Sequence, residues 1–202
     1  MRTKILLTIL LGVSFLGKSQ NFDIGFGLGT GTSYIYENMD KTVDIKYSPS
    51  FSSYVDLKYS PISSYFDLKL NFQYINTGIS GLNWESNAPI NGEVSSFTSF
   101  ILLEHLNVKK IWNFGYNLGF GYTTENYIEL LDQRTQSEFR KFMSITISGL
   151  ISIKISEKVS IQLIPSLLWT DPANTFRSSD KWYIAGEDLS FLTQVGFEYR
   201  LK

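Results

Sequence analysis

Apolar and polar residues alternate one by one along most of this chain, which is the pattern of β-strands. The first alternating stretch is NFDIGFGLGTGTSYIY. One face of it carries Phe22, Ile24, Phe26 and Leu28, and the other carries Asp23, Gly25, Gly27 and Gly29. Because successive side chains of a strand point to opposite faces, the stretch predicts a strand with one apolar face and one nearly bare face.

Seven further segments alternate in the same way. They cover residues 50–59, 65–74, 97–108, 111–122, 143–154, 159–169 and 189–201. The connections between the segments are of two kinds. Short turns lie at 60–64, 109–110 and 156–158, and longer polar connections lie at 37–49, 76–96, 124–138 and 171–188. Long and short connections therefore alternate, which predicts an all-β, eight-stranded antiparallel up-and-down barrel with every short turn at one end.

The phase of one segment is ambiguous. In FTSFILLEHLNV, Phe100, Leu102 and Leu106 share a face with Glu104, whereas Ile101 and Leu103 share the other face with His105. Both faces are therefore mixed, which is compatible with a bulge or a shift of phase near the end of the strand.

The N-terminal residues have the three parts of a secretory signal peptide. Arg2 and Lys4 precede a mostly apolar run from Ile5 to Leu16, and Gly17-Lys18-Ser19 provides small residues for cleavage. The run is too short to be a membrane-spanning helix. We therefore expect a signal peptide at 1–19 and a single barrel domain at 20–202, since no linker divides the rest.

Composition and charge exclude several classes of protein. Removing Arg2, Lys4 and Lys18 from the 18 basic residues leaves 15 against 19 acidic ones, a net charge of −4, which disfavours nucleic acid as a partner. The absence of cysteine excludes disulfides. The glycines that follow Asp23 lack the spacing of a dinucleotide fingerprint, and no GK[ST] follows them.

Alternation alone does not tell a soluble barrel or β-sandwich, which has an apolar interior, from a membrane barrel, which has an apolar exterior. Four features favour the membrane: apolar faces about ten residues long, long loops gathered at one end, a last strand that runs to the chain terminus, and aromatic residues near strand ends. These aromatic residues are Phe22, Tyr34, Tyr36, Tyr59, Trp112, Tyr122, Trp169 and Tyr199.

With these features the chain resembles the small eight-stranded outer-membrane barrel proteins of Gram-negative bacteria, such as the barrel of outer membrane protein A. The resemblance rests on pattern over residues 20–202 and not on a motif. It implies export through the periplasm and an outer-membrane location, with lipid, lipopolysaccharide and the barrel assembly machinery as partners. The family's last strand usually ends in an aromatic residue, whereas this chain ends in Leu201-Lys202.

The inward face of such a barrel would carry a polar network. Its expected members are Asp23, Asp56, Lys58, Asp67, Lys69, Gln162, Gln194, Glu198 and Arg200. Eight strands enclose a lumen that side chains can fill, and charges there must be paired, so we expect a salt-bridged plug or, alternatively, a gated polar path. Lumen glycines are expected at Gly25, Gly27, Gly29, Gly115, Gly119 and Gly121, leaving room for long side chains or for water.

No residue set indicates an enzyme, a cofactor or a metal site. The only histidine, His105, lies near the short-turn end, and Glu104 beside it points to the opposite face. Some eight-stranded outer-membrane barrels act on lipid A, but their catalytic groups lie toward the outer leaflet. The acids Glu125, Glu129 and Asp132 are expected on a solvated loop surface.

Aromatic residues also occur in the expected long loops, at Trp84, Tyr127, Phe176, Trp182 and Tyr183. Exposed loops on a rigid scaffold are common binding sites, although these rings could equally cover the barrel mouth. The sequence therefore favours a barrel with a structural or binding role through its extracellular loops, toward an extracellular or envelope partner that it does not specify. The alternatives are a narrow channel for small or amphipathic solutes and, third, a subunit of an envelope or secretion complex.

Overall fold

The computed structural model describes residues 22–33, 43–61, 64–83, 87–108, 111–131, 134–170 and 188–201. Its strands are β1 (Phe22–Thr32), β2 (Val43–Tyr47), β3 (Ser50–Tyr59), β4 (Asp67–Asn83), β5 (Pro89–Asn107), β6 (Trp112–Leu131), β7 (Arg134–Lys154), β8 (Val159–Thr170) and β9 (Asp188–Arg200). The signal peptide expected at 1–19 lies outside the described residues. No helix among them is long and apolar enough to cross a membrane.

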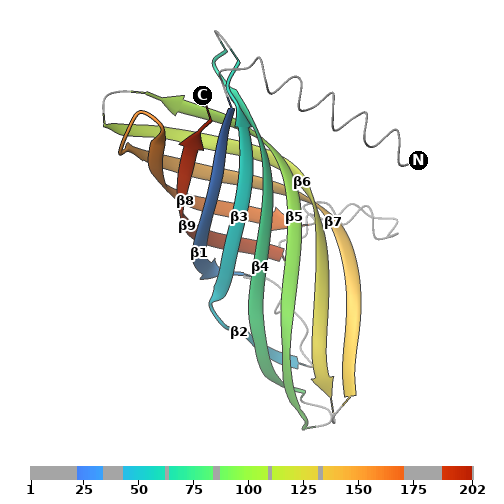
Figure 1. Ribbon diagram of the computed structural model, residues 1–202. Helices are drawn as coiled ribbons and strands as arrows, with labels where there is room; N and C mark the ends of the chain where they lie inside the picture. The colour runs from blue at the N-terminus through green and yellow to red at the C-terminus, as the bar shows by residue number, and fades with distance from the viewer. Residues whose placement is uncertain are drawn as a thin grey trace, which may run out of the picture.

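The described strands close into one barrel (Figure 1). Every neighbouring pair is antiparallel, and the first strand pairs with the last, with Asp23 opposite Arg200 and Thr32 opposite Phe191. Pairing of β4 with β5 completes the ring. The predicted eight-stranded antiparallel up-and-down barrel is confirmed.

Nine strand segments make eight barrel positions because β2 and β3 lie end to end along β4. Tyr47 in β2 is opposite Ile79, and Phe51 in β3 is opposite Asn76, so three residues face two between these pairs. The extra residue forms a β-bulge at Ser48 and Pro49. Proline has no amide hydrogen for the ladder, and bulges are where strands tolerate it. The Ser48 amide donates to the Gly78 carbonyl at 2.9 Å.

The barrel has its polar residues inside and its apolar residues outside. Asp23, Lys58 and Lys69 are buried, whereas Phe26, Leu118 and Phe120 are exposed. The outward apolar face of β6 runs from Trp112 to Tyr122. At about 3.3 Å per residue and a tilt of about 40°, these ten or so residues rise about 25 Å, the height of the apolar band of a membrane barrel.

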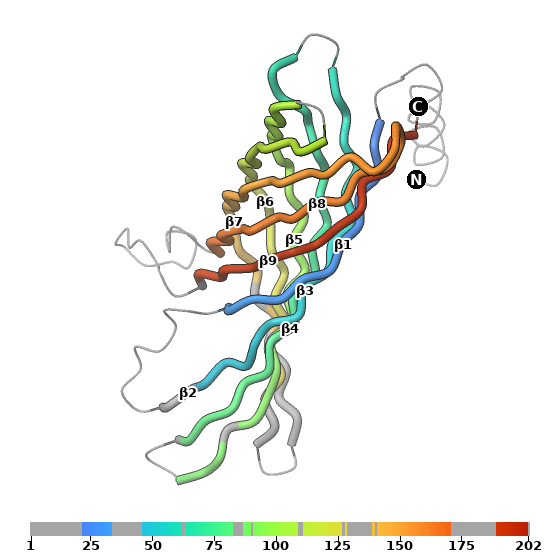
Figure 2. The backbone as a smooth tube through the Cα atoms, turned by 90° about the vertical axis from the view of Figure 1, so that its left-hand side faces the viewer, coloured from blue at the N-terminus to red at the C-terminus, as the bar shows by residue number. Residues whose placement is uncertain are grey.

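Four neighbouring strands continue well past this band, as Figures 1 and 2 both show. β4, β5, β6 and β7 contain 17, 19, 20 and 21 residues, whereas β1 contains 11 and β8 contains 12. β8 ends at Thr170 opposite Ser144, so Arg134 to Met143 of β7 lie beyond it. We call the extended parts of β4–β7 beyond the apolar band, together with β2, the outer wall.

The outer wall corrects part of the sequence prediction. The segments 76–96 and 124–138 were expected to be long polar loops, but most of their residues pair in the β4–β5 and β6–β7 ladders. Above the apolar band the outward face of a strand no longer meets lipid and need not be apolar, so the alternation of apolar and polar residues weakens although the strand continues and inward residues such as Ile79 and Val94 stay buried. Both chain ends of the barrel lie at the opposite, short-turn end, where the Leu201 amide donates to the Phe22 carbonyl at 2.9 Å.

Candidate functional site in the barrel lumen

The lumen is filled in layers, and β4 passes through all of them. Asp67 lies in a wide vestibule at the short-turn end. Lys69 belongs to a group of buried ions, and Asn71 and Gln73 line a small cavity. Ile75 then belongs to an apolar cluster. Every second residue of β4 points into the lumen, so each of these residues contributes to the next layer.

The buried ions form a group that we call the lumen ion cluster: Asp23, Asp56, Lys58, Lys69, Glu104 and Glu198. Lys58 Nζ lies 3.1 Å from Asp23, 3.3 Å from Glu104 and 2.5 Å from Glu198. Lys69 Nζ lies 2.6 Å from Glu104, 3.4 Å from Asp56 and 3.8 Å from Glu198. Four carboxylates thus surround two ammonium groups, and the two glutamates bridge the lysines.

Glu104 is the central acid, and sequence reasoning did not place it. Its side chain is fully buried and contacts both lysines. The β4–β5 and β5–β6 registers are continuous through this region, with Asp67 opposite Glu104 and Glu104 opposite Asn117. The strand therefore has no bulge there, and Phe100, Leu102 and Glu104 all face the lumen.

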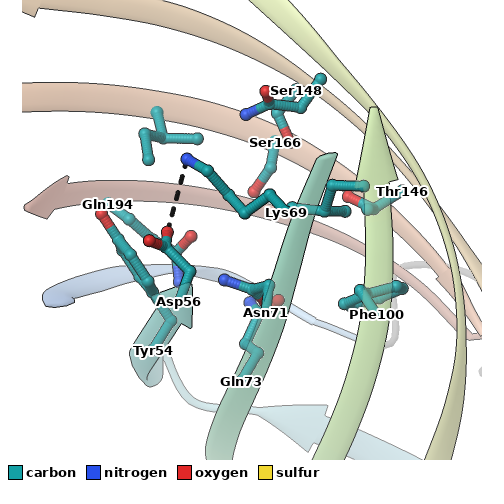
Figure 3. A pocket seen from close by; sticks show the side chains of 13 residues that line it. Tyr54, Asp56, Lys69, Asn71, Gln73, Phe100, Thr146, Ser148, Ser166 and Gln194 are labelled. Atoms are coloured by element: carbon teal, nitrogen blue, oxygen red, sulfur yellow. Dashed lines mark ion pairs between the residues drawn. The ribbon is translucent and has the colours of Figure 1, made fainter. Parts of the chain in front are cut away.

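Figure 3 shows the small cavity next to the ion cluster, with Lys69 extending from β4 toward Asp56. Its volume is about 20 Å³. Tyr54 Oη, Asp56 Oδ1 and Gln73 Nε2 are buried close to it without a hydrogen-bond partner in the described part of the chain. A space of this size holds about one water molecule, which is far less than a solute path needs.

An apolar layer fills the lumen on the far side of the cavity. Its residues are Ile75, Phe100, Leu102, Leu168 and Leu192. Beyond it, buried hydroxyl groups bond in short chains: Ser50 contacts Ser33 and Thr77 at 2.6 Å each, and Thr123 contacts Thr98 at 2.7 Å. The lumen is thus closed by an ionic layer and then by an apolar one.

Most of the expected lumen glycines lie where a bulky side chain from a neighbouring strand rests against the inner face of the barrel. A Cβ on Gly25 would overlap Asp56, one on Gly27 would overlap the ring of Tyr54, and one on Gly119 would overlap Leu102. A Cβ on Gly121 would meet Phe100, whereas Gly29 and Gly115 approach mainly the neighbouring strand, at Thr193 and Gln194 and at His105 and Leu106. Gly196, which we did not expect, lies against the Tyr54 hydroxyl. The glycines therefore make room for neighbouring side chains.

The remaining members of the expected network are spread along the lumen. Gln162 Nε2 donates to Glu198 at 2.9 Å, so it belongs to the cluster's edge. Gln194 Nε2 donates to Ser52 at 3.3 Å near the small cavity. Asp67 and Arg200 lie at the vestibule instead of in the ion cluster. Arg200 Nε is 3.3 Å from Asp23, and its side chain is 55% exposed.

His105 lies on the outer face, away from Glu104. Its ring stacks on Tyr65 with centroids 4.0 Å apart, and Phe66 and Tyr116 also contact it. Its Nδ1 is 3.0 Å from the Tyr65 carbonyl oxygen. The histidine therefore joins an aromatic group at the short-turn end and fastens the β3–β4 turn to β5.

Of the aromatic residues expected in loops, Tyr127 lies instead within β6, in the outer wall. The others, Trp84, Phe176, Trp182 and Tyr183, lie outside the described residues. Phe139 in β7, which we did not single out, is the exposed wall aromatic, with 69% of its surface accessible. It lies between the loop expected at 124–138 and the strand expected from 143, so neither expected element included it.

Comparison with solved structures gives several small barrels with nearly complete mutual coverage. OprG, an outer membrane protein from Pseudomonas aeruginosa, is 11% identical with a TM-score of 0.56, covering 90% of this chain and 96% of its own. Neisserial surface protein A is 9% identical with a TM-score of 0.53, covering 91% and 98%. The chain has the fold of an outer-membrane β-barrel.

A third barrel of this fold is Ail, the attachment invasion locus protein of Yersinia pestis, solved in complex with the heparin analogue sucrose octasulfate. It is 13% identical with a TM-score of 0.51, covering 89% of this chain and 98% of its own. No protein-family model and no curated protein sequence matches the chain. The likeness is therefore one of fold, with an outward apolar band and a polar lumen as its physical basis.

Proposed function

We propose that this barrel is a closed anchor in the outer membrane and that its outer wall is an extracellular binding surface. The observation that carries the proposal is the contrast between the two ends of β4–β7. Within the apolar band these strands enclose a lumen filled by the ion cluster and the apolar layer. Beyond the band they continue past the end of β8 as the outer wall.

The wall is suited to presenting contacts outside the membrane. Its strands are hydrogen-bonded along their length, with Leu131 opposite Arg134 at the β6–β7 tip. A paired sheet holds side chains in place at less entropic cost than a free loop. Ail, whose structure contains a heparin analogue, is a small barrel of the same fold with a bound ligand.

The proposal also covers how the protein reaches the outer membrane and how it is oriented there. We infer that residues 1–19 direct export and are removed, that the short turns face the periplasm, and that outer-membrane lipid, lipopolysaccharide and the assembly machinery are contacted on the way or in place. The distribution of short turns and extended strands supports this orientation, because outer-membrane barrels have short periplasmic turns and longer extracellular parts. We propose no catalytic role, since His105 and Glu104 lie on opposite faces.

Photo-cross-linking tests the binding surface directly. A photoreactive phenylalanine analogue at Phe139 lies outward on the wall, and the same analogue at Phe120 lies outward within the apolar band, 54% exposed. In intact cells we expect a discrete macromolecular cross-link from position 139 and only lipid adducts from position 120. Identical products at both positions would contradict a binding role for the wall.

A narrow channel is the second candidate, because the vestibule already opens about 350 Å³ of the lumen. Purified barrel in planar bilayers should give no reproducible conductance if the lumen is closed as proposed. Steady openings that disappear when the ion cluster is altered would favour the channel. A role as a subunit of an envelope complex, the third candidate, would be supported if the cross-linked product at position 139 were an envelope protein.

A further inference from the structure

The vestibule at the short-turn end is much larger than the cavity beside the ion cluster. It measures about 350 Å³ and is open to solvent. Its walls come from the β3–β4 turn and the start of β4, the β5 and β6 ends, and the β7–β8 turn with the end of β9. This volume is in the range of small-molecule sites, which begin at about 300 Å³.

The floor of the vestibule is ionic but already paired. Lys58, Asp23 and Glu198 line it, each less than 10% exposed, and Lys58 bridges the two acids. Ser152 and Ser160 add hydroxyl groups, and Leu106 and Val108 add an apolar strip. A ligand that entered would therefore meet a closed floor and take its charged contacts from the side walls.

The side walls carry opposite charges. Asp67 lines the β4 side. Lys154, Lys158 and Arg200 line the β7, β8 and β9 side, where Glu157 offsets one of the three positive charges. In the ring of eight strands, β4 and β8 are separated by four positions in either direction, so the two charged walls face each other across the barrel.

These charges are only partly satisfied within the barrel, where Asp67 has a side-chain hydrogen bond with Ser60. Among the residues that the structure describes, no ion pair joins Asp67, Lys154 or Lys158 to a neighbour, whereas Arg200 contacts Asp23 at 3.3 Å. A ligand with a negative group at one end and a positive group at the other would complement both walls at once.

We propose that the vestibule is a binding site for a small zwitterion of the amino-acid or short-peptide class. The ligand carboxylate lies toward Lys154, Lys158 and Arg200, and its ammonium group lies toward Asp67. The apolar strip of Leu106 and Val108 contacts the ligand's side chains. The site is at the opposite end of the barrel from the outer wall, so it adds a periplasmic site to the proposed extracellular one. A negative binding result at either site leaves the proposal for the other site unaffected.

Binding of a defined dipeptide tests the site. Mature protein folded in detergent micelles is titrated with alanyl-alanine, and the same titration uses N-acetyl-alanyl-alanine, which lacks the ammonium group, and alanyl-alaninamide, which lacks the carboxylate. Because a charge-assisted contact contributes about 1.5 kcal/mol or more, each blocked peptide should bind about tenfold more weakly. Asp67→Asn should abolish the preference for the free ammonium group, and Lys158→Gln with Lys154→Gln the preference for the free carboxylate.

Lys141→Gln is the matched control, since it removes an exposed lysine from the outer wall and not from the vestibule. It should leave dipeptide affinity unchanged. Each variant is first shown to be folded by its heat-dependent migration in gels. If folded protein gives no saturable binding, or if the three peptides bind equally well, or if Lys141→Gln weakens binding as much as the vestibule variants, the proposal is wrong.

Discussion

Lys69 is the more buried of the two lysines in the lumen ion cluster, and Lys69→Met tests that cluster. The side chain is 1% exposed, and it is the only described cation paired with Asp56. Replacing it with methionine keeps most of the volume and leaves Asp56 buried without a positive partner. Glu104 loses its nearest cation, at 2.6 Å, but keeps Lys58 at 3.3 Å.

Breaking a buried ion pair from one side costs about 3–5 kcal/mol, because the remaining charge is left uncompensated. The opposite substitution, Glu104→Gln, should cost less. Four carboxylates surround two lysines in the cluster, so Lys58 keeps Asp23 and Glu198 when Glu104 is neutral. A loss of about 1–2 kcal/mol is expected, the usual range for a buried polar group that loses its ionic partner. Lys69→Met should therefore lower the free energy of unfolding more than Glu104→Gln does.

The assay is urea unfolding of the protein in lipid vesicles, followed by tryptophan fluorescence and by gel migration. The double variant Lys69→Met with Asp56→Asn removes the uncompensated charge and should recover at least half of the single variant's loss, because a neutral pair avoids the desolvation penalty. The wall variant Lys141→Met serves as a control and should change stability little. If Lys69→Met were as stable as the unmodified protein, the cluster would not be a structural element of the lumen.

Two more substitutions test the packing and the membrane boundary. Gly27→Val should destabilise the barrel by about 1–3 kcal/mol in the same unfolding assay, because the added carbons overlap Tyr54, and a stability equal to that of the unmodified protein would show that the ring lies elsewhere. Leu118→Arg, closer to the middle of the outward Trp112–Tyr122 face, should cost about 2–4 kcal/mol in vesicles if that position faces lipid. Phe139→Arg, on the same outward face but in the outer wall, should change stability by less than about 0.5 kcal/mol, and equal losses at both positions would contradict the proposed boundary.

The barrel itself could be predicted from the sequence because lipid imposes a one-sided pattern. Each strand that crosses the apolar band must present apolar residues outward, and the lumen accepts small and polar ones, so alternation is nearly strict in β1, β6 and β9. The glycines of β1 were also informative, since a bare inward face implies that a neighbouring side chain occupies the space. The fold class follows from these two constraints.

The phase of Glu104 could not be predicted because the lumen is not uniformly polar. Both faces of this strand carry apolar residues, so its phase stayed ambiguous, and the structure shows why: Phe100, Leu102 and Leu168 form an apolar layer inside. A signal was nevertheless present. A glutamate on the lipid face would have no charged partner, whereas the predicted lumen already held Lys58 and Lys69. Pairing requirements of buried charges thus carry information that hydropathy does not.

The outer wall was missed for a related reason, and the reason bears on function. A strand that crosses lipid must present apolar residues outward, but the outward face of a wall strand lies in solvent and has no such requirement. Outward polar residues such as Lys141 therefore occur there, although inward residues such as Ile79 and Val94 stay buried. Hydrogen-bonded pairing continues nevertheless, through Leu131 and Arg134 at the tip. Outward residues of the wall, which contact neither lipid nor the lumen, are free to vary for binding. The outward face of the wall, which folding constrains least, is therefore the surface on which a binding role depends.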